Sequence, residues 1–536
     1  MKVLYNIGYA CTGKQCKTGN SNKNAFRFIK ADNTILDISF DDLEKETNQF
    51  ANLLKGLGFH EGDVFFTFLP KCREQIVAFL GSLKNKIISG TLFANFGEEA
   101  VLDRLKDAKA RGIITKKNIY KKLAGTWDKL ADLRYIIVID LDEHLDDRVL
   151  SYAKLLSTSS PNFTIPDTEP NTPSVLHYTS GSTGKPKGVL HVHNSLIMQT
   201  NTTKEILQLR EDDVFWCTAD PGWVTGTSYG IIGPCSLGVS QICYEGGMNV
   251  RKWFEILERE QVTVWYTAPT ALRMIMQEST IDFNTYDLSK LRSVFSIGEP
   301  LNPEILRWSR TVLKKDIYDT YFQTETGTIM IANRPGYAIQ PGSMGPSVDT
   351  MKCEILDDEG HMLPSNIPGN LCIKVPWESM FITYLNNPQV YQKKFKAGYY
   401  YTGDQAYKTD DGYFWFVGRI DDIINTAGHL VSPFEVESII LEMEQIIDVA
   451  VIAAPDPILF EKVVAYVKVK SDLPPSTDLD LQIRIYVSKK LSPMCAPAEI
   501  IIADKIPKNK SGKIMRRYLR AVYEGKDPGD ISTIDQ

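Results

Sequence analysis

A loop rich in glycine and hydroxyl groups, residues 178–189, constrains the fold of this chain more than any other segment. It reads Tyr-Thr-Ser-Gly-Ser-Thr-Gly-Lys-Pro-Lys-Gly-Val and follows an apolar stretch, residues 175–178, that has the character of a buried strand. Glycines let a backbone turn tightly and approach a ligand. Free backbone N–H groups, hydroxyls and lysines can together surround an anion. We therefore expect a phosphate-holding loop at the end of a strand.

Two other interpretations of this loop fit less well. A Walker A loop needs Gly-x-x-x-x-Gly-Lys-Ser/Thr, but Thr179 stands at the first glycine position and Pro186 at the hydroxyl position. A flexible Gly/Ser linker rarely carries two lysines and a proline directly after an apolar strand. The loop residues expected to hold a phosphate are Thr179, Ser180, Gly181, Ser182, Thr183, Gly184 and Lys187.

Length and composition narrow the class of protein. The chain has 536 residues, 43% of them hydrophobic, which is enough for two or more domains. A net charge of −6 argues against a general nucleic-acid binder. Nine dispersed cysteines without a Cys-x-x-Cys pair predict reduced thiols and a cytoplasmic location. We expect no secretory signal, because the first residues lack a long apolar run, and no membrane span, because the least polar long stretch, residues 229–243, is too short.

The seven histidines do not indicate a metal site. His191 and His193 lie two residues apart after the loop, and in a strand they would share a face. A zinc site needs clustered Cys or His at ligand spacing, and no third ligand is in view. We interpret both as ordinary polar residues.

Apolar strands alternate with amphipathic helices in the first part of the chain, which predicts a layered α/β domain. A hairpin follows at residues 399–417, and the pattern after Asp422 (strand, helix, strand, strand, helix) predicts a small α+β domain. We therefore expect an N-terminal α/β domain with a β-rich part, residues 1–419, and a C-terminal domain, residues 420–536. We expect helices at 41–58, 73–84 and 481–490, and strands at 64–69, 87–92, 135–139, 262–266, 294–297, 449–453 and 463–469.

Four further motifs carry groups that suit a nucleotide. Residues 319–327, Asp-Thr-Tyr-Phe-Gln-Thr-Glu-Thr-Gly, offer an aromatic ring for a purine and a carboxylate for Mg²⁺. Gly298-Glu299-Pro300 forms a turn after a strand. Asp404 and Arg419 lie fifteen residues apart. The carboxylate can accept hydrogen bonds from ribose hydroxyls, and the guanidinium can donate hydrogen bonds to the ribose and a phosphate. A basic run spans residues 507–517. Taken singly, these are also explained as surface turns, solvated charges or a nucleic-acid patch.

In this order and spacing, the motifs resemble those of the adenylate-forming superfamily of acyl-CoA synthetases, peptide-synthetase adenylation domains and luciferases. The resemblance covers residues 178–517, and residues 48–92 resemble the family's N-terminal region. It implies Lys513 as the catalytic lysine, Glu325 as the Mg²⁺ ligand and Asp421 as the hinge of a mobile C-terminal domain. Besides the loop, it implies ATP contacts from Gly298, Glu299, Pro300, Asp319, Thr320, Tyr321 (stacking on adenine), Phe322, Gln323, Thr324, Asp404 and Arg419.

Residues 217–226, Cys-Thr-Ala-Asp-Pro-Gly-Trp-Val-Thr-Gly, look most like the AMP-forming acetyl-CoA synthetases of this superfamily. The resemblance implies an acyl pocket. Acetate enzymes usually have Trp at the position of Phe322 and Val at the position of Ile297. Relatives that use longer acids tend to have Gly at the position of Phe322. A bulky aromatic therefore still closes the pocket, which implies a short acid such as acetate or propionate. The pocket residues are Trp223, Val224, Thr225, Ile297 and Phe322.

The chain departs from the family pattern at Leu430. Acetate enzymes commonly have Arg there, and that Arg reaches the nucleotide phosphate, which Leu cannot do. Gly428, with Ala427 beside it, matches the glycine that lets the pantetheine arm of CoA pass. Because of Leu430, a non-catalytic nucleotide-binding relative remains an alternative. So does a ligase for medium-chain or branched acids.

The resemblance implies a two-step reaction. A carboxylate reacts with MgATP to give an acyl-adenylate and pyrophosphate, and CoA then displaces AMP to give a thioester. The expected partners are a short carboxylic acid, ATP, Mg²⁺ and CoA, with no nucleic acid and no membrane. The oligomeric state is not predicted. A peptide-synthetase adenylation domain would use a carrier protein, and a luciferase would use O₂.

Overall fold

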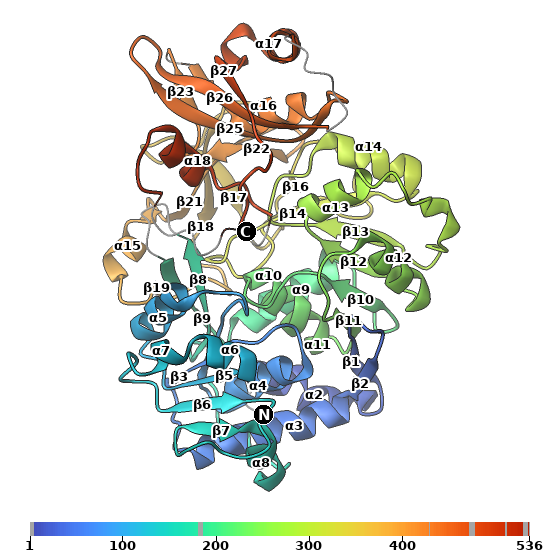
Figure 1. Cartoon of the computed structure of the whole chain (residues 1–536), viewed down its shortest axis with the longest axis vertical. Helices are drawn as coiled ribbons and strands as arrows, with labels where there is room; N and C mark the ends of the chain where they lie inside the picture. Colours follow the sequence, from blue (N-terminus) through green and yellow to red (C-terminus); the bar gives the residue numbers. More distant parts are fainter. Residues whose placement is uncertain are drawn as a thin grey trace.

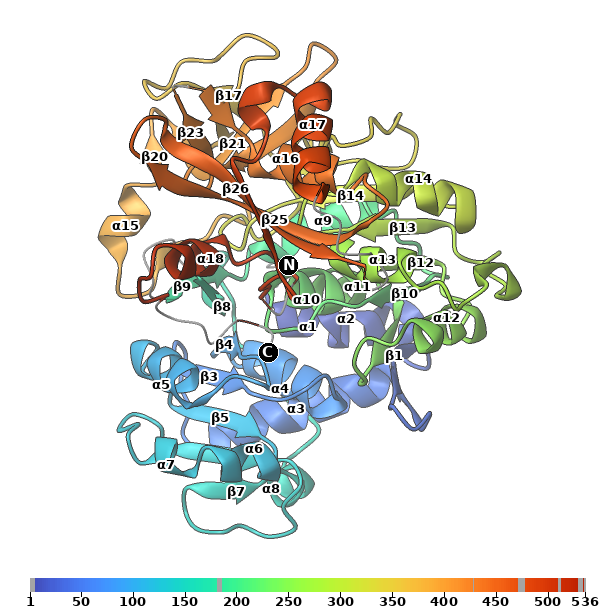
Figure 2. The same ribbon diagram turned by 45° about the horizontal axis from the view of Figure 1, so that its top comes forward.

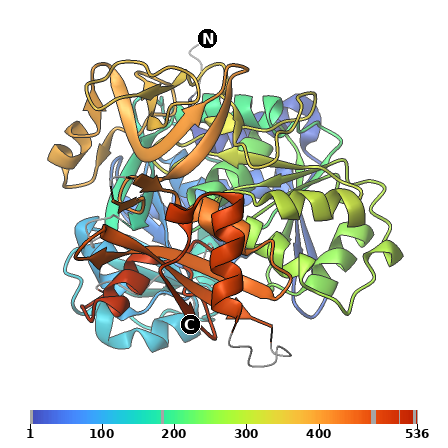
Figure 3. The ribbon, with the colours of Figure 1, turned by 90° about the horizontal axis from the view of Figure 1, so that it is seen from above.

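The computed structural model describes residues 5–180, 186–427, 429–470, 478–509, 512–528 and 534. A large N-terminal domain forms most of the molecule, and a small C-terminal domain lies at one end of it (Figure 1). Seen from that end, the small domain and an antiparallel sheet of the large domain lie next to each other, in front of the remaining part of the large domain (Figure 3). None of the helices among the described residues has the length and apolar character needed to cross a membrane.

The first eight-stranded sheet of the large domain carries the phosphate-loop segment. Its strand order is β19-β9-β8-β4-β3-β5-β6-β7, parallel except for β9, which pairs antiparallel with both β8 and β19. The loop joins β8 to β9, so it lies where the parallel part of the sheet ends. The strands are β3 (Val64–Thr67), β4 (Ile88–Thr91), β5 (Gly112–Thr115), β6 (Tyr135–Val138), β7 (Val149–Ser151), β8 (Pro173–Ser180), β9 (Pro186–Val192) and β19 (Thr383–Tyr384).

The second eight-stranded sheet supplies the remaining walls of the site. Its order is β15-β14-β13-β12-β10-β11-β1-β2, parallel from β14 to β1, with antiparallel strands at both edges. The central strands β12 and β13 are fully buried, as expected for parallel strands covered on both faces. The strands are β1 (Asn24–Ile29), β2 (Ile35–Ser39), β10 (Val214–Cys217), β11 (Ser240–Tyr244), β12 (Val264–Thr267), β13 (Ser293–Ser296), β14 (Ile317–Tyr321) and β15 (Ile331–Ala332).

Helices cover these two sheets. The longest, α3, starts at a capping box in which Ser39 and Asp42 exchange side-chain and backbone hydrogen bonds. The helices of the large domain are α1 (Ile7–Cys11), α2 (Gly13–Gln15), α3 (Phe40–Gly56), α4 (Arg73–Lys84), α5 (Glu98–Asp107), α6 (Lys117–Lys122), α7 (Ala124–Trp127), α8 (Tyr152–Thr158), α9 (Ser195–Glu205), α10 (Val224–Thr227), α11 (Gly233–Ser236), α12 (Val250–Arg259), α13 (Pro269–Met276), α14 (Pro303–Val312) and α15 (Pro388–Gln392).

A six-stranded antiparallel sheet completes the large domain. Its long hairpin, β21 and β22, pairs Asp404 with Arg419, which brings these two candidate residues side by side. The hairpin turns at residues 410–412, as predicted. The strands are β16 (Gly345–Pro346), β17 (Cys353–Leu356), β18 (Gly369–Lys374), β20 (Phe395–Lys396), β21 (Tyr399–Lys408) and β22 (Tyr413–Arg419).

The small domain packs its helices on a five-stranded sheet of order β24-β23-β26-β25, with β27 added parallel to β26. It has hydrophobic clusters of its own, drawn from residues 424–523. Its elements are β23 (Ile424–Thr426), β24 (His429–Val431), α16 (Pro433–Ile440), β25 (Ile446–Asp456), β26 (Phe460–Val469), α17 (Leu479–Lys490), β27 (Glu499–Ile502) and α18 (Arg516–Tyr523).

The predicted fold class is confirmed: a large layered α/β domain with a β-rich part, followed by a small α+β domain. The predicted helix at residues 73–84 has the same bounds as α4, and the other predicted elements agree within a few residues. Short pieces such as β19, β20 and β24 were not predicted, because two or three residues carry no periodic signal.

Candidate active site

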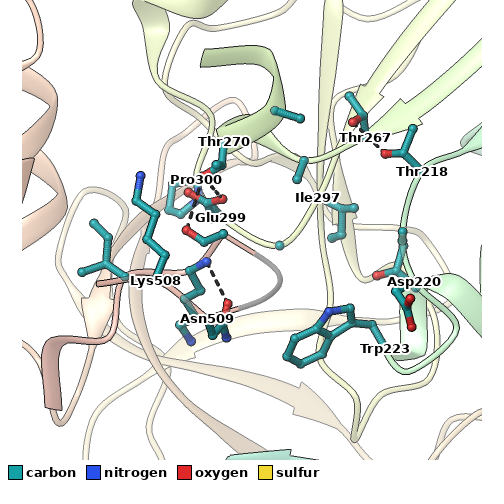
Figure 4. A pocket seen from close by; sticks show the side chains of 18 of the residues that line it. Thr218, Asp220, Trp223, Thr267, Thr270, Ile297, Glu299, Pro300, Lys508 and Asn509 are labelled. Atoms are coloured by element: carbon teal, nitrogen blue, oxygen red, sulfur yellow. Dashed lines mark hydrogen bonds between the residues drawn. The ribbon is translucent and has the colours of Figure 1, made fainter. Parts of the chain in front are cut away.

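A cavity of about 1350 Å³ runs between the two domains, and it collects most of the residues predicted from the motifs. One end lies between the two α/β sheets, and the small domain covers the other. Figure 4 shows part of it, with Trp223 and Ile297 on one side and Lys508 and Asn509 of the small domain on the other. The predicted residues that line it are Thr179, Lys187, Trp223, Val224, Thr225, Ile297, Gly298, Glu299, Pro300, Asp319, Thr320, Tyr321, Phe322, Gln323, Thr324, Glu325, Asp404, Arg419 and Lys513.

A few predicted residues lie elsewhere. Ala427 and Asp421 are exposed and do not line the cavity in this arrangement of the domains. Asp421 belongs to the four-residue connection between β22 and β23. The side chain of Ser180, and Gly181, Ser182, Thr183, Gly184 and Gly428, lie outside the described residues.

The carboxylate of Asp404 is held in a fixed orientation within the cavity wall. The hydroxyl of Tyr321 and the amide of Gln323 both donate to its Oδ2, the amide at 2.7 Å. The Arg419 Nε lies 4.0 Å from Oδ1. Burial, together with the charge of Asp404, raises the pKa of Tyr321 well above its ordinary value, so the hydroxyl stays a donor. An aromatic ring, a carboxylate and a guanidinium thus face the same part of the cavity, as a base, a ribose and a phosphate would require.

Asp319 supports the neighbouring turn, residues 298–300, from beneath. It accepts a hydrogen bond of 2.6 Å from the Ser296 hydroxyl and one of 3.4 Å from the Leu301 backbone N–H. These residues flank the turn, and Gly298 has φ +99°, a conformation that favours glycine. Burial raises the pKa of Asp319 to about 7. Asp319 lines the cavity, and its described contacts fasten the turn to β13 and β14.

Glu325 lines the cavity near two lysines. Its Oε1 accepts a hydrogen bond of 2.8 Å from Tyr384, and the Lys187 ammonium lies 5.6 Å from the centre of the Tyr384 ring. Lys394 lines the same corner of the cavity. Burial lowers the pKa of Lys394, and the charge of Glu325 opposes this. Two lysines and a carboxylate can therefore share a polyphosphate and its counter-ion.

The donor set of this corner fits Mg²⁺. Within the described part of the chain, no group of three or more His, Cys, Asp or Glu side chains is arranged to hold a metal ion. Mg²⁺ in nucleotide sites is usually bound through one or two carboxylates, with phosphate oxygens and waters supplying the rest. A single carboxylate, oriented by Tyr384, meets that requirement.

All five predicted acyl-pocket residues line the cavity. Trp223 packs on Phe93 with ring centroids 4.7 Å apart, and Phe322 packs edge-on against Tyr229 at 5.4 Å. Both aromatic side chains are therefore held by rings behind them. Ile297 is buried to 8% exposure at the end of β13. The predicted pocket residues therefore include two aromatic side chains that pack against other rings.

Lys513 reaches this cavity from the small domain. Its backbone N–H donates a hydrogen bond of 2.9 Å to the side-chain oxygen of Asn509, and the Asn509 backbone N–H donates one of 2.8 Å to the Lys513 carbonyl. Gly512 lies against the large domain, where a Cβ would come within 2.7 Å of the Thr270 Cβ. Burial lowers the pKa of Lys513 to about 8, and the nearby Arg419 adds to the effect. The loop thus places a cation beside Asp404 and Arg419.

The two domains thus enclose one cavity that holds aromatic, carboxylate and cationic side chains of the large domain together with Lys513 of the small domain. The family model described as "AMP-binding enzyme" matches residues 14–385, and the model "AMP-binding enzyme C-terminal domain" matches residues 435–513. The chain belongs to this family, the adenylate-forming superfamily that its motifs predicted.

Relatives are similar over nearly the whole chain. Acetyl-coenzyme A synthetase of Bacillus subtilis (strain 168) is 40% identical over 534 residues, 99% of this chain and 92% of that protein. Acetyl-coenzyme A synthetase of Pyrobaculum aerophilum is 34% identical over 567 residues, 99% of this chain and 85% of that protein. Among solved structures, the anthranilate CoA ligase AuaEII in complex with anthranoyl-AMP has a TM-score of 0.89 at 28% identity, covering 97% of this chain and 98% of that one.

Several residues of the site were not found from the sequence. Tyr384 enters because β19 pairs with β9, and Lys394 enters beside β21, and neither belongs to a motif. Lys508 belongs to the basic run, but its partner Asp448, at 2.6 Å, lies in a plain apolar strand. A hydrophobic pattern locates such strands. It does not indicate which polar residues of distant segments come into contact.

The lowered pKa of Lys513 predicts an alkaline limit for adenylate formation. Below about pH 8 the side chain is charged, and the charge is lost as the pH rises through that value. The kcat/KM for ATP, which reports the free enzyme, should therefore fall above about pH 8. The Lys513→Arg variant should be slower but should lack this fall, because a guanidinium does not titrate there. A fall of equal size in the variant would assign the limit to another group.

Proposed function

We propose that this protein is an AMP-forming short-chain acyl-CoA synthetase whose acid is acetate or a near relative. The reaction class, ligation of a carboxylic acid to CoA with formation of AMP, follows from its full-length similarity to acetyl-coenzyme A synthetases. The observation that carries the proposal is that Lys513 of the small domain enters the same cavity as Glu325, Asp404 and the Phe322 pocket. The site residues and their roles below are part of the proposal.

In the first step, a carboxylate oxygen of the acid attacks the α-phosphorus of ATP, and the bond to pyrophosphate breaks. Lys513 and Arg419 supply positive charge where negative charge develops. Asp404 receives the ribose hydroxyls, and the Tyr321 ring packs on adenine. Glu325 would hold Mg²⁺, which when bound neutralises charge on the phosphates. Lys187 and Lys394 face the same phosphates.

In the second step, the CoA sulfur attacks the acyl carbon, and AMP leaves with the electron pair of the broken C–O bond. No covalent bond to the enzyme forms, so the protein contributes positioning and charge. We place the domain boundary after Arg419 and the hinge at Asp421, in the short connection between β22 and β23. Rotation there would bring Ala427 and Gly428 toward the cavity, where CoA enters. We also propose a cytoplasmic location, on the nine cysteines that are free in the structure.

Purified protein supplied with ATP, Mg²⁺, acetate and CoA should release AMP and pyrophosphate, and omission of CoA should leave bound acyl-adenylate. A panel of C2 to C8 acids then ranks the substrates. AMP formation with none of these acids would contradict the proposal. CoA-independent release of free adenylate would favour a different acceptor.

Phe322 is expected to limit acyl length. Discrimination by one methylene is worth about 1–3 kcal/mol, so wild type should prefer C2 to C4 acids. Phe322→Gly should move the optimum to longer acids and impair acetate, because the cavity no longer packs against the methyl group. Phe322→Trp should disfavour propionate relative to acetate. The measurement is kcat/KM across C2 to C8, and an unchanged profile in the Gly variant would show that another residue, such as Ile297, forms the floor.

Lys513→Ala should slow adenylate formation by about 10²-fold or more, as loss of a preorganised charge donor does. Thioester formation from supplied acyl-adenylate and CoA should change much less, since rotation at the hinge then moves the lysine away. Single-turnover assays of each half-reaction measure both rates. Equal losses in the two would refute the assigned role.

Leu430 lies on β24 with 61% of its surface exposed, outside the cavity in this arrangement. If rotation brings β24 to the nucleotide, Leu430→Arg adds a charged donor worth about 1.5–3 kcal/mol. The variant should then bind a nonhydrolysable acyl-adenylate analogue more tightly in calorimetry. Leu430→Met is the neutral control and should bind as wild type does. No gain in the Arg variant would mean that β24 does not reach the phosphate.

A further inference from the structure

Two neighbouring helices of the large domain, α13 and α14, contact the small domain along a polar seam. On α13, Thr270 and Arg273 lie one turn apart, and Gln277 follows at the helix end, so all three lie on one face. The Gln277 amide donates 2.6 Å to the Ile447 carbonyl, and the Arg273 Nη1 lies 3.8 Å from the Asp448 Oδ1. In Figure 2, β25, which carries these partners, passes over the side of the large domain that holds α13 and α14.

The seam is joined to the loop that carries Lys513, residues 505–516, which we call the lysine loop. The second oxygen of Asp448 lies 2.6 Å from the Lys508 ammonium. The backbone of Lys508 forms an isolated antiparallel β-bridge with that of Ile514, the residue after Lys513. Lys508 therefore lies across the loop from Lys513. Arg273, Asp448 and Lys508 thus form a continuous chain of charges from α13 to the lysine loop.

These charges are largely withdrawn from water. The side chains of Arg273, Asp448 and Lys508 are 12%, 16% and 14% exposed, respectively. An ion pair in such a place is screened less by salt than a surface pair. The Thr270 hydroxyl, which donates 2.6 Å to Glu299, also lies 3.3 Å from the Gly512 carbonyl (Figure 4 shows Thr270 and Glu299). Residues of α13 therefore contact the lysine loop directly and through Asp448.

The two ion pairs of Asp448 differ in which domains they join. Asp448 and Lys508 both belong to the small domain, so their contact survives any rigid rotation of that domain. Arg273 belongs to the large domain and keeps its partner only in the arrangement that places Lys513 in the cavity. The Arg273–Asp448 contact is therefore specific to that arrangement.

We propose that Arg273 is a positioning residue for Lys513, which through Asp448 holds the small domain in the arrangement that forms the acyl-adenylate. The inference rests on the two-step reaction proposed above. A single ion pair of this kind is weak enough to be broken in every turnover, yet it biases the two arrangements.

Arg273→Gln and Asp448→Asn should each slow adenylate formation, measured as acetate-dependent exchange of pyrophosphate into ATP, by about two- to fivefold. The double variant should lose no more than the greater single loss, because both changes remove the same contact. Thioester formation from acetyl-adenylate and CoA should be unchanged or faster. Arg273→Lys should recover part of the exchange rate, which a merely structural defect would not allow.

Arg251→Gln is the matched control: it removes an exposed arginine of helix α12 whose described charge interaction is with Glu278 of its own domain, and it should behave as wild type. Equal losses of Arg273→Gln in both half-reactions, or independent losses in the double variant, would overturn the proposal. Absence of exchange in wild type would instead count against the proposed function.

A second measurement does not depend on turnover. Hydrogen exchange of the backbone at residues 505–516, in protein without ligands, reports how firmly the lysine loop is docked. Exchange there should be faster in Arg273→Gln than in wild type, with no change in β12 or β13 of the large-domain core. Identical exchange of this segment in the two proteins would also refute the positioning role.

Discussion

The charge of Lys513 has to be withdrawn from water between two domains that do not share a core. Within the described chain, the hydrophobic clusters of the large domain end before residue 420, and those of the small domain begin at Ile424. Lys513 is therefore not enclosed by an apolar interior shared between the two domains, although its neighbour Ile514 packs on a cluster of the small domain. The desolvation that lowers its pKa has to be offset by polar contacts made only when the domains meet, and the site is complete only in that arrangement.

This constraint explains how the remaining charges are distributed. Asp404 and Arg419, which face Lys513, stand on the rigid hairpin of β21 and β22, next to the connection on which the small domain would turn. A sheet therefore fixes their positions, whereas the position of Lys513 depends on how the small domain is placed. Arg516 of the small domain pairs with Glu437 through two hydrogen bonds of 2.6 and 2.7 Å, so a second cation near the cavity is already neutralised within its own domain. Lys513 is one of the charges that the small domain offers to the cavity.

The sequence predicted the parts of this structure that depend on local pattern. The apolar runs located the buried strands, because a strand covered on both faces has to be apolar throughout. The motif residues reached one cavity because the ends of neighbouring strands meet at one edge of a sheet. Tyr384, Lys394 and Arg273 could not be found in this way. Each depends on a contact between segments far apart in the chain, and each belongs to a residue type that is common on surfaces.

Two separate constraints, one local and one between the domains, favour glycine at position 512. Its φ of +88° is a local reason for glycine, visible as a turn in the basic run. Its second reason, the 2.7 Å between a built Cβ and Thr270, arises only from the docked large domain. The first would be satisfied in any arrangement of the domains, whereas the second exists in this one alone. A seam that combines such a close approach with polar contacts, and in which neither domain lends its hydrophobic core to the other, can open without exposing a hydrophobic core to water. An enzyme that presents one cavity to two successive chemical steps requires a seam of this kind.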